Sequence, residues 1–143
     1  MLTLGEAKRV GFLAMDRRMK PLGMSQATWR TLYWLDREGG GVTQTALAER
    51  MGIEGPTLVR LLDNLERGGL LERRPSPTDR RANTLHLTAK ARPVLKTINR
   101  IADEVRTELC DGIPESALAA ARIVLEQVVE NALRGRSSLS QSA

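Results

Sequence analysis

The fold of this chain is decided by residues 44–63, which read QTALAERMGIEGPTLVRLLD. Thr43 is placed to cap a short helix over residues 44–51, which a glycine then ends. Pro56 suits the first turn of a second helix because its missing N–H group is not needed there. The small side chain of Ala48 lets the two helices approach closely. The segment therefore predicts a helix, a tight turn and a helix, which is either a DNA-reading unit or an ordinary helical hairpin.

Two short strands are expected after this unit, at residues 70–74 and 84–88, on either side of a turn-rich segment. They would form a β-hairpin whose basic rim consists of Arg73, Arg74, Arg80 and Arg81. When a helix fills the major groove, a hairpin beside it can place a guanidinium in the adjacent minor groove. The layout favours a winged helix that binds DNA. The alternative is a solvated, salt-bridged hairpin in which Asp79 holds Arg81.

Further helices are predicted on both sides of this unit. Apolar residues at three- and four-residue spacings indicate helices over residues 4–19, 26–37, 89–109 and about 115–133. Ser25 and Thr88 are placed to cap the second and third of these helices. The Ser-rich segment 135–143 is expected to be a flexible tail. The fold class is therefore mainly α with a small β-hairpin wing, in a single domain over the 143 residues.

Charge and composition narrow the classes of function. The chain has 22 Lys and Arg against 17 Asp and Glu, and the net charge of +5 suits a polyanionic partner. A single cysteine, Cys110, and a single histidine, His86, exclude an internal disulfide and a Cys/His zinc cluster within one protomer. The apolar stretch at residues 10–15 is too short for a signal peptide or a membrane span, which predicts a cytoplasmic protein.

The single histidine and the single cysteine are also candidate functional groups. His86 alternates with Leu85 and Leu87, which places it on the exposed face of the hairpin. The thiol of Cys110 is either a redox sensor or an inert structural group. No motif supplies an oxyanion hole or an orienting acid for a Cys110 and His86 pair, so we expect no enzyme, no metal and no cofactor.

Five stretches carry a resemblance to a known family: IEGPTLVR at residues 53–60, LDNLERGGLL at 62–71, DRRA at 79–82, RMKPL at 18–22 and SQATW at 25–29. With these, and with the Leu-Thr pair at 87–88, the chain resembles the MarR (multiple-antibiotic-resistance regulator) family over roughly residues 5–134. The resemblance is nearest to the SlyA-like branch of that family. Gly55 departs from the branch, which often has a polar residue there, so the contact of that side chain to a base or a phosphate is not carried over to this chain.

The resemblance implies a homodimeric, winged-helix transcriptional regulator that binds a pseudo-palindromic operator in double-stranded DNA, as a repressor or a counter-silencer. Residues 1–22 and 89–134 would form the dimerisation helices, and residues 25–88 the winged helix-turn-helix lobe. The roles carried over from the family are base contacts for Pro56, Thr57 and Arg60, minor-groove contacts for Arg80 and Arg81, and bracing of the wing for Asp79.

A small-molecule effector is a further implication of the resemblance, because related regulators often accept phenolic or aromatic carboxylate molecules in a cleft beside the DNA-binding lobe. Trp29 and Tyr33 are four residues apart on one helix face and are near Arg17 and Arg18 in the sequence, a set that would suit an aromatic anion. The alternative is that these four residues belong to the ordinary core and surface. Two other functions stay open: a low-specificity nucleoid-type DNA-binding protein, and a helical small-molecule-binding dimer without DNA binding.

Overall fold

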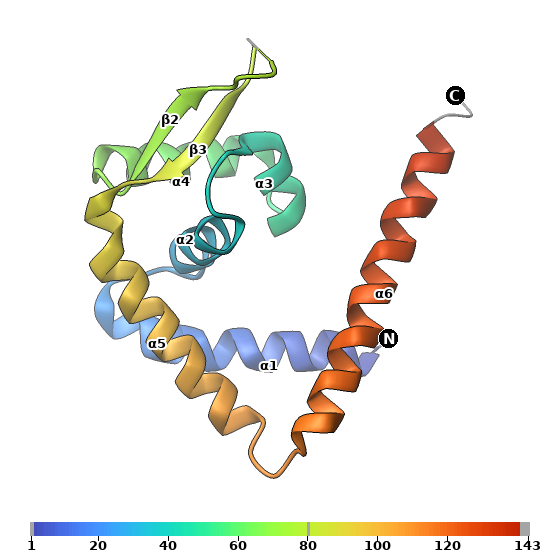
Figure 1. Cartoon of the computed structure of the whole chain (residues 1–143). Coiled ribbons are helices and arrows are strands. Elements are labelled where there is room, and N and C mark those ends of the chain that lie inside the picture. Colours follow the sequence, from blue (N-terminus) through green and yellow to red (C-terminus); the bar gives the residue numbers. More distant parts are fainter. Residues whose placement is uncertain (1, 80, 141–143) are drawn as a thin grey trace. The chain divides into compact units, whose positions relative to one another are not determined.

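A computed structural model describes residues 2–79 and 81–140 of the chain. The chain divides into two compact units, Met1–Leu109 and Cys110–Ala143. The first unit contains α1 (Leu2–Met19), η1 (Lys20–Leu22), α2 (Gln26–Glu38), β1 (Val42–Thr43), α3 (Gln44–Met51), α4 (Gly55–Arg67), β2 (Leu71–Pro75), β3 (Asn83–Leu87), η2 (Ala89–Ala91) and α5 (Arg92–Leu109) (Figure 1). The second unit contains α6 (Glu115–Ser140).

Local sequence signals place the boundaries of the helices α2 and α3. The Ser25 hydroxyl accepts a hydrogen bond from the Thr28 N–H, and the Thr43 hydroxyl accepts one from the Ala46 N–H, both at 3.2 Å. These two N-caps satisfy backbone donors that the first turn of a helix cannot pair by itself. Gly52 ends α3 in the left-handed conformation at φ +63°, which a glycine adopts without a steric penalty.

Three antiparallel strands form the wing, in the order β1-β3-β2. The predicted hairpin of β2 and β3 is present, with Leu71 opposite Leu87. A third strand, β1, was not predicted: it pairs Val42 with Leu85 and thereby joins the loop after α2 to the wing. The wing is therefore anchored to the helical lobe along one edge.

The core of the first unit connects its helices to the wing. Leu32 and Leu35 of α2, Leu58 of α4 and Ile98 of α5 are buried together with Leu85 of β3. The buried leucines of α4 recur at three- and four-residue spacings, so one face of that helix packs into the core. The helices and the wing therefore share one hydrophobic core.

Thr88 lies at the junction of the wing and α5, and it does not cap that helix as its position predicted. Its hydroxyl donates a 2.6 Å hydrogen bond to the Gly69 carbonyl, which ties the end of β3 to the loop after α4. A short 3₁₀ turn, η2, follows instead, and α5 begins at Arg92. The prediction was wrong because a hydroxyl can reach a backbone carbonyl that is distant in sequence.

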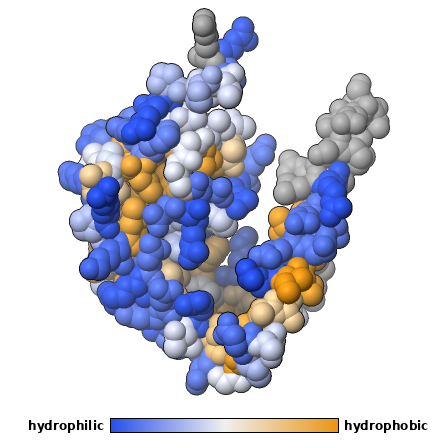
Figure 2. Space-filling model, in the orientation of Figure 1, coloured by the Kyte–Doolittle hydropathy of each residue, from blue (hydrophilic) through white to orange (hydrophobic). Residues whose placement is uncertain are grey.

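The helix α6 carries large apolar side chains that are exposed, namely Ile123, Val124, Leu125, Val128 and Val129. Figure 2 shows apolar residues on the surface of this helix. The helix extends to Ser140 rather than ending near residue 134, so the boundary of the expected flexible tail 135–143 is corrected. A glycine and several serines weaken a helix by about 1 kcal/mol or less each, whereas a proline would stop it. Residues 141–143 lie outside the described residues.

None of the described helices combines the length and the apolar character needed to cross a bilayer.

Candidate nucleic-acid interface

One face of α4 is buried and the other is free. Leu58 and Leu62 pack into the core, and the three residues predicted to contact bases, Pro56, Thr57 and Arg60, are exposed. In the part of the chain that the structure describes, no hydrogen bond or ion pair engages the Arg60 guanidinium. The side of α4 that faces away from the core can therefore present polar groups to a ligand as large as a duplex.

The turn between α3 and α4 holds the first turn of α4 at the surface. The Ile53 N–H donates a 3.1 Å hydrogen bond to the Ala48 carbonyl, which closes the turn behind Gly52. Glu54 stands at the N-cap position of α4, but its side chain caps no backbone N–H. The N-terminal amides of α4 are thus available to an anionic group, which the positive end of a helix attracts.

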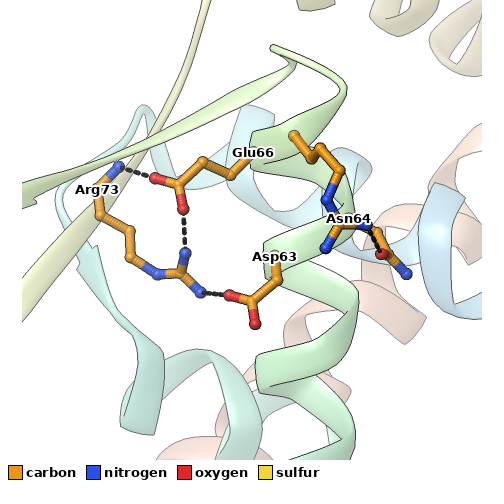
Figure 3. A network of polar contacts seen from close by, with 5 residues as sticks. Asp63, Asn64, Glu66 and Arg73 are labelled. Carbon is orange, nitrogen blue, oxygen red and sulfur yellow. Dashed lines mark hydrogen bonds and ion pairs between the residues drawn. The ribbon is translucent and has the colours of Figure 1, made fainter.

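Arg73 connects the wing to α4, as Figure 3 shows. Its guanidinium donates to Asp63 at 2.7 Å and is paired with Glu66. The Arg73 backbone N–H also donates to the Glu66 carboxylate, at 3.2 Å. Because only 20% of this side chain is exposed, Arg73 is not part of the basic rim that the sequence predicted. Its role is to fix the angle between β2 and α4.

Arg73 and Arg74 point to opposite sides of β2, as neighbouring residues of a strand do. The Arg74 side chain is 59% exposed, and its guanidinium pairs with Glu72 on the same strand. The acidic partners of Arg73, Asp63 and Glu66, are three residues apart on α4, and this spacing was the signal in the sequence that could have revealed the contact.

The tip of the wing is shaped by Asp79. Its carboxylate accepts a 2.9 Å hydrogen bond from the Arg81 backbone N–H, and the Asp79 carbonyl accepts one from the Ala82 N–H at 3.0 Å. Asp79 thus constrains the backbone and does not hold the Arg81 guanidinium, which is exposed. Arg80 lies outside the described residues.

A second arginine that the sequence did not single out links α1 to the helix-turn-helix. The Arg30 guanidinium stacks on the Phe12 ring with 4.6 Å between the guanidinium carbon and the ring centroid. Its Nη2 donates a 3.1 Å hydrogen bond to the Met51 carbonyl at the end of α3. Arg30 therefore helps to hold the C-terminal end of α3 against the packed helices of the first unit.

The four residues proposed to receive an effector mostly have partners within the protein. Trp29 is 3% exposed, and its indole N–H donates a 2.7 Å hydrogen bond to Asp16. The Tyr33 hydroxyl accepts from Arg37 at 2.9 Å, and Arg18 pairs with Glu108 of α5. Only Arg17 has no partner among the described side chains. The alternative, in which Trp29 is a core residue, agrees with this arrangement.

The chain is similar to known regulators over most of its length. The model of the MarR family matches residues 22–82. The solved structure of the transcriptional regulator PA3341 is 41% identical, with a TM-score of 0.84 over 93% of this chain and 97% of that chain. Wild-type MarR from E. coli, in its apo form, is 20% identical, with a TM-score of 0.70 over 88% of this chain and 93% of that chain.

A third solved structure is that of CouR from Rhodococcus jostii RHA1, bound to p-coumaroyl-CoA. It is 25% identical to this chain, with a TM-score of 0.75 over 88% of both chains. Together the structural matches confirm the predicted fold class, a mainly helical winged helix with helices at both ends of the chain.

Proposed function

This chain belongs to the MarR family of DNA-binding transcriptional regulators, and we propose that it acts as a homodimer on a pseudo-palindromic operator. Each protomer inserts α4 into a major groove, where Pro56, Thr57 and Arg60 face base edges. The wing then reaches the adjacent minor groove with Arg80 and Arg81. Membership of a family of regulators agrees with the prediction that the chain is not an enzyme.

The observation that carries this proposal is the exposed face of α4 with Arg60, whose guanidinium has no partner among the described residues, beside a wing that Arg73 holds at a fixed angle. A helix end and a hairpin can address neighbouring grooves only if their relative orientation is maintained on binding. The ion pairs of Arg73 provide that orientation before DNA arrives.

The dimer is supported by the apolar side chains of α6. Residues such as Ile123 and Val124, which are 61% and 60% exposed, are unfavourable in water and would be buried by a second copy of the chain. A two-fold axis would place the two α4 helices about 34 Å apart, one turn of B-DNA. Light scattering at micromolar concentration should give about twice the chain mass of 15.8 kDa, and a value near 15.8 kDa would contradict the dimer.

The finer assignments rest on the sequence resemblance. We place the chain nearest the SlyA-like branch, acting in the cytoplasm as a repressor whose operator affinity falls when a small aromatic carboxylate binds near Arg17, Arg18, Trp29 and Tyr33. The relative CouR was solved with p-coumaroyl-CoA, a thioester of an aromatic acid, which supports the aromatic part of this ligand and not its free carboxylate. Calorimetric titration with salicylate should give a saturable signal that Arg17→Gln abolishes. If the signal is absent or unchanged in the variant, this effector site is wrong.

The DNA-binding mechanism is tested by selecting bound sites from random duplexes and then measuring competition binding at several salt concentrations. Arg60→Ala should cost roughly 1–3 kcal/mol per half-site and relax the preference at particular base pairs. Arg81→Ala should weaken binding most at A·T-rich flanks and reduce the salt slope by about one for each phosphate that the protein no longer neutralises. Arg80→Ala is predicted to act in the same way. Arg106→Ala, an exposed change on α5, is the matched control.

Each rival function gives a different result in this experiment. A nucleoid-type protein would bind operator and scrambled duplexes equally, and all variants would lose affinity without a change in preference. A helical dimer that binds only small molecules would select no duplex. Unchanged affinity in the Arg60 and Arg81 variants would remove the mechanism proposed for the winged helix.

A further inference from the structure

Arg30 lies on α2, and its side chain contacts both α1 and α3. The guanidinium carbon is 4.6 Å from the centroid of the Phe12 ring on α1. Its Nη2 donates a 3.1 Å hydrogen bond to the carbonyl of Met51, the last residue of α3. The half-buried Arg30 side chain therefore connects α1 to the helix-turn-helix.

The surroundings of the Arg30 guanidinium determine its position closely. The Phe12 ring packs edge-on against Trp29, with 5.8 Å between the ring centroids, and the Trp29 indole is itself held by Asp16. Arg30 Nε is buried and has no hydrogen-bond partner among the described residues. A buried N–H group without a partner lowers stability, so its presence calls for an explanation other than stability. We therefore looked for a role of Arg30 in orientation.

The Met51 carbonyl is well placed to control the orientation of α4. It belongs to the last turn of α3, whose carbonyls have no partners further along the helix. Residues 52–54 form the turn that follows, and α4 begins at Gly55. The Thr31 hydroxyl of α2 also donates to the Met51 sulfur, at 3.3 Å, but a thioether is a weak acceptor. The direction in which α4 leaves the turn therefore depends strongly on the hydrogen bond from Arg30.

Two other arginines of this region stack on aromatic rings. The Arg50 guanidinium of α3 is 4.7 Å from the Trp34 ring of α2, so it fastens α3 to α2. The Arg37 guanidinium is 5.0 Å from the Tyr33 ring, one turn away on the same helix. Of these three arginines, Arg30 alone contacts α1 in the part of the chain that the structure describes.

We propose that Arg30 is a positioning residue for operator recognition, which fixes the helix-turn-helix relative to α1 and thereby sets the half-site spacing that the dimer accepts. The inference rests on the proposed function, in which α1 is a dimerisation helix and α4 enters the major groove. The exposed Leu4, Val10 and Leu13 of α1 agree with burial by a second copy. One base pair of spacing corresponds to about 3.4 Å and a tenth of a turn. A lobe that can rotate against α1 tolerates such a change, whereas a fixed lobe does not.

The test compares the selected operator with duplexes whose half-sites are one base pair closer together or further apart. The wild type should bind the selected spacing about tenfold more tightly than either altered spacing, because a mismatch must be absorbed by deforming the DNA. Arg30→Met keeps an unbranched stem over Phe12 but loses the guanidinium, and it should reduce this ratio to about threefold or less. Its preference at each base pair within a half-site should stay that of the wild type. Arg37→Met removes the same charge and a stacked guanidinium from α2, and as the matched control it should keep the wild-type ratio.

A distance measurement without DNA separates failure of this inference from failure of the proposed function. With Cys110→Ser and Thr57→Cys, each protomer carries one spin label at the start of α4. Pulsed EPR of the dimer should give a narrow distance distribution that Arg30→Met broadens and Arg37→Met does not. Circular dichroism checks folding, and Phe12→Leu, which removes the ring under Arg30, should broaden the distribution as well.

The outcomes of the two measurements are distinct. A wild type that selects no duplex contradicts the proposed function, and the distance distributions then decide alone whether Arg30 fixes the lobe. The inference is overturned if Arg30→Met keeps the wild-type distances or the wild-type spacing ratio. It is also overturned if Arg37→Met changes either of them as much as Arg30→Met does.

Discussion

Replacing Arg73 with alanine should loosen the wing from α4 and destabilise the protein measurably. In the wild type, the Arg73 guanidinium bridges two carboxylates of α4, Asp63 and Glu66, from the neighbouring strand β2. The variant removes both ion pairs but keeps the backbone N–H of residue 73 and its hydrogen bond to Glu66. The change is therefore confined to interactions of the side chain.

The magnitude follows from the exposure of the three groups. The Arg73 side chain is 20% exposed, whereas those of Asp63 and Glu66 are 47% and 40% exposed. Water therefore solvates the two carboxylates that lose their partner in the variant. The large free-energy cost of an unpaired, fully buried charge does not apply to them. The variant loses two partly screened, charge-assisted ion pairs and the packing of the arginine stem. Together these losses should lower the free energy of unfolding by about 1–2 kcal/mol.

The assay is urea unfolding at one fixed protein concentration, because the stability of a dimer depends on concentration. Double-mutant cycles that combine Arg73→Ala with Asp63→Asn and with Glu66→Gln should give coupling energies of about 0.5–1 kcal/mol each. Arg74→Ala is the matched control on the same strand, and it should change stability by less than about 0.5 kcal/mol. The reasoning fails if both couplings are zero within error, or if the Arg74 variant is as unstable as the Arg73 variant.

Three other changes test the packing and the backbone. Leu58→Ala should destabilise by about 2–5 kcal/mol because Leu58 is fully buried, while Val59→Ala, at an exposed position of the same helix, should cost about 0.5 kcal/mol or less in chemical denaturation. Gly40→Ala should lower the melting temperature more than Gly39→Ala, because both positions have a positive φ but only the first would press a Cβ against the chain's single histidine; equal losses would contradict the close approach. Ser25→Ala should cost about 1 kcal/mol of stability because it removes the N-cap of α2, and an unchanged urea midpoint would show that the cap contributes nothing.

The helices of the lobe could be predicted from the sequence because their signals are local. The caps at Ser25 and Thr43 act on amides three residues ahead, and Gly52 ends α3 through its own backbone conformation. Each of these signals operates within a few residues, and each was confirmed. The exposed positions of Pro56 and Arg60 follow in the same way from the helical period of the buried leucines of α4, which are Leu58, Leu62 and Leu65.

The features that the sequence did not predict depend on contacts between distant residues. A two-residue strand has no periodicity, so β1 is defined only by its pairing with β3. The alternation of β2 shows that Arg73 and Arg74 face opposite ways, but not that α4 lies on the Arg73 side. The sequence predicted His86 on the exposed face of the hairpin, but it is half-buried, since the glycine loop that covers it comes from another part of the chain.

The three-stranded sheet of the wing also bears on solubility. An exposed sheet edge offers unpaired backbone groups to strands of other molecules, and such edges promote aggregation. Here one edge is β1, which is only two residues long, and the other is β2, which ends at Pro75 and carries the charged pair of Glu72 and Arg74. Proline donates no backbone hydrogen bond, and charges oppose the docking of a neighbouring strand. The wing can therefore project into solvent to approach a duplex without recruiting the wing of another molecule into a continuous sheet.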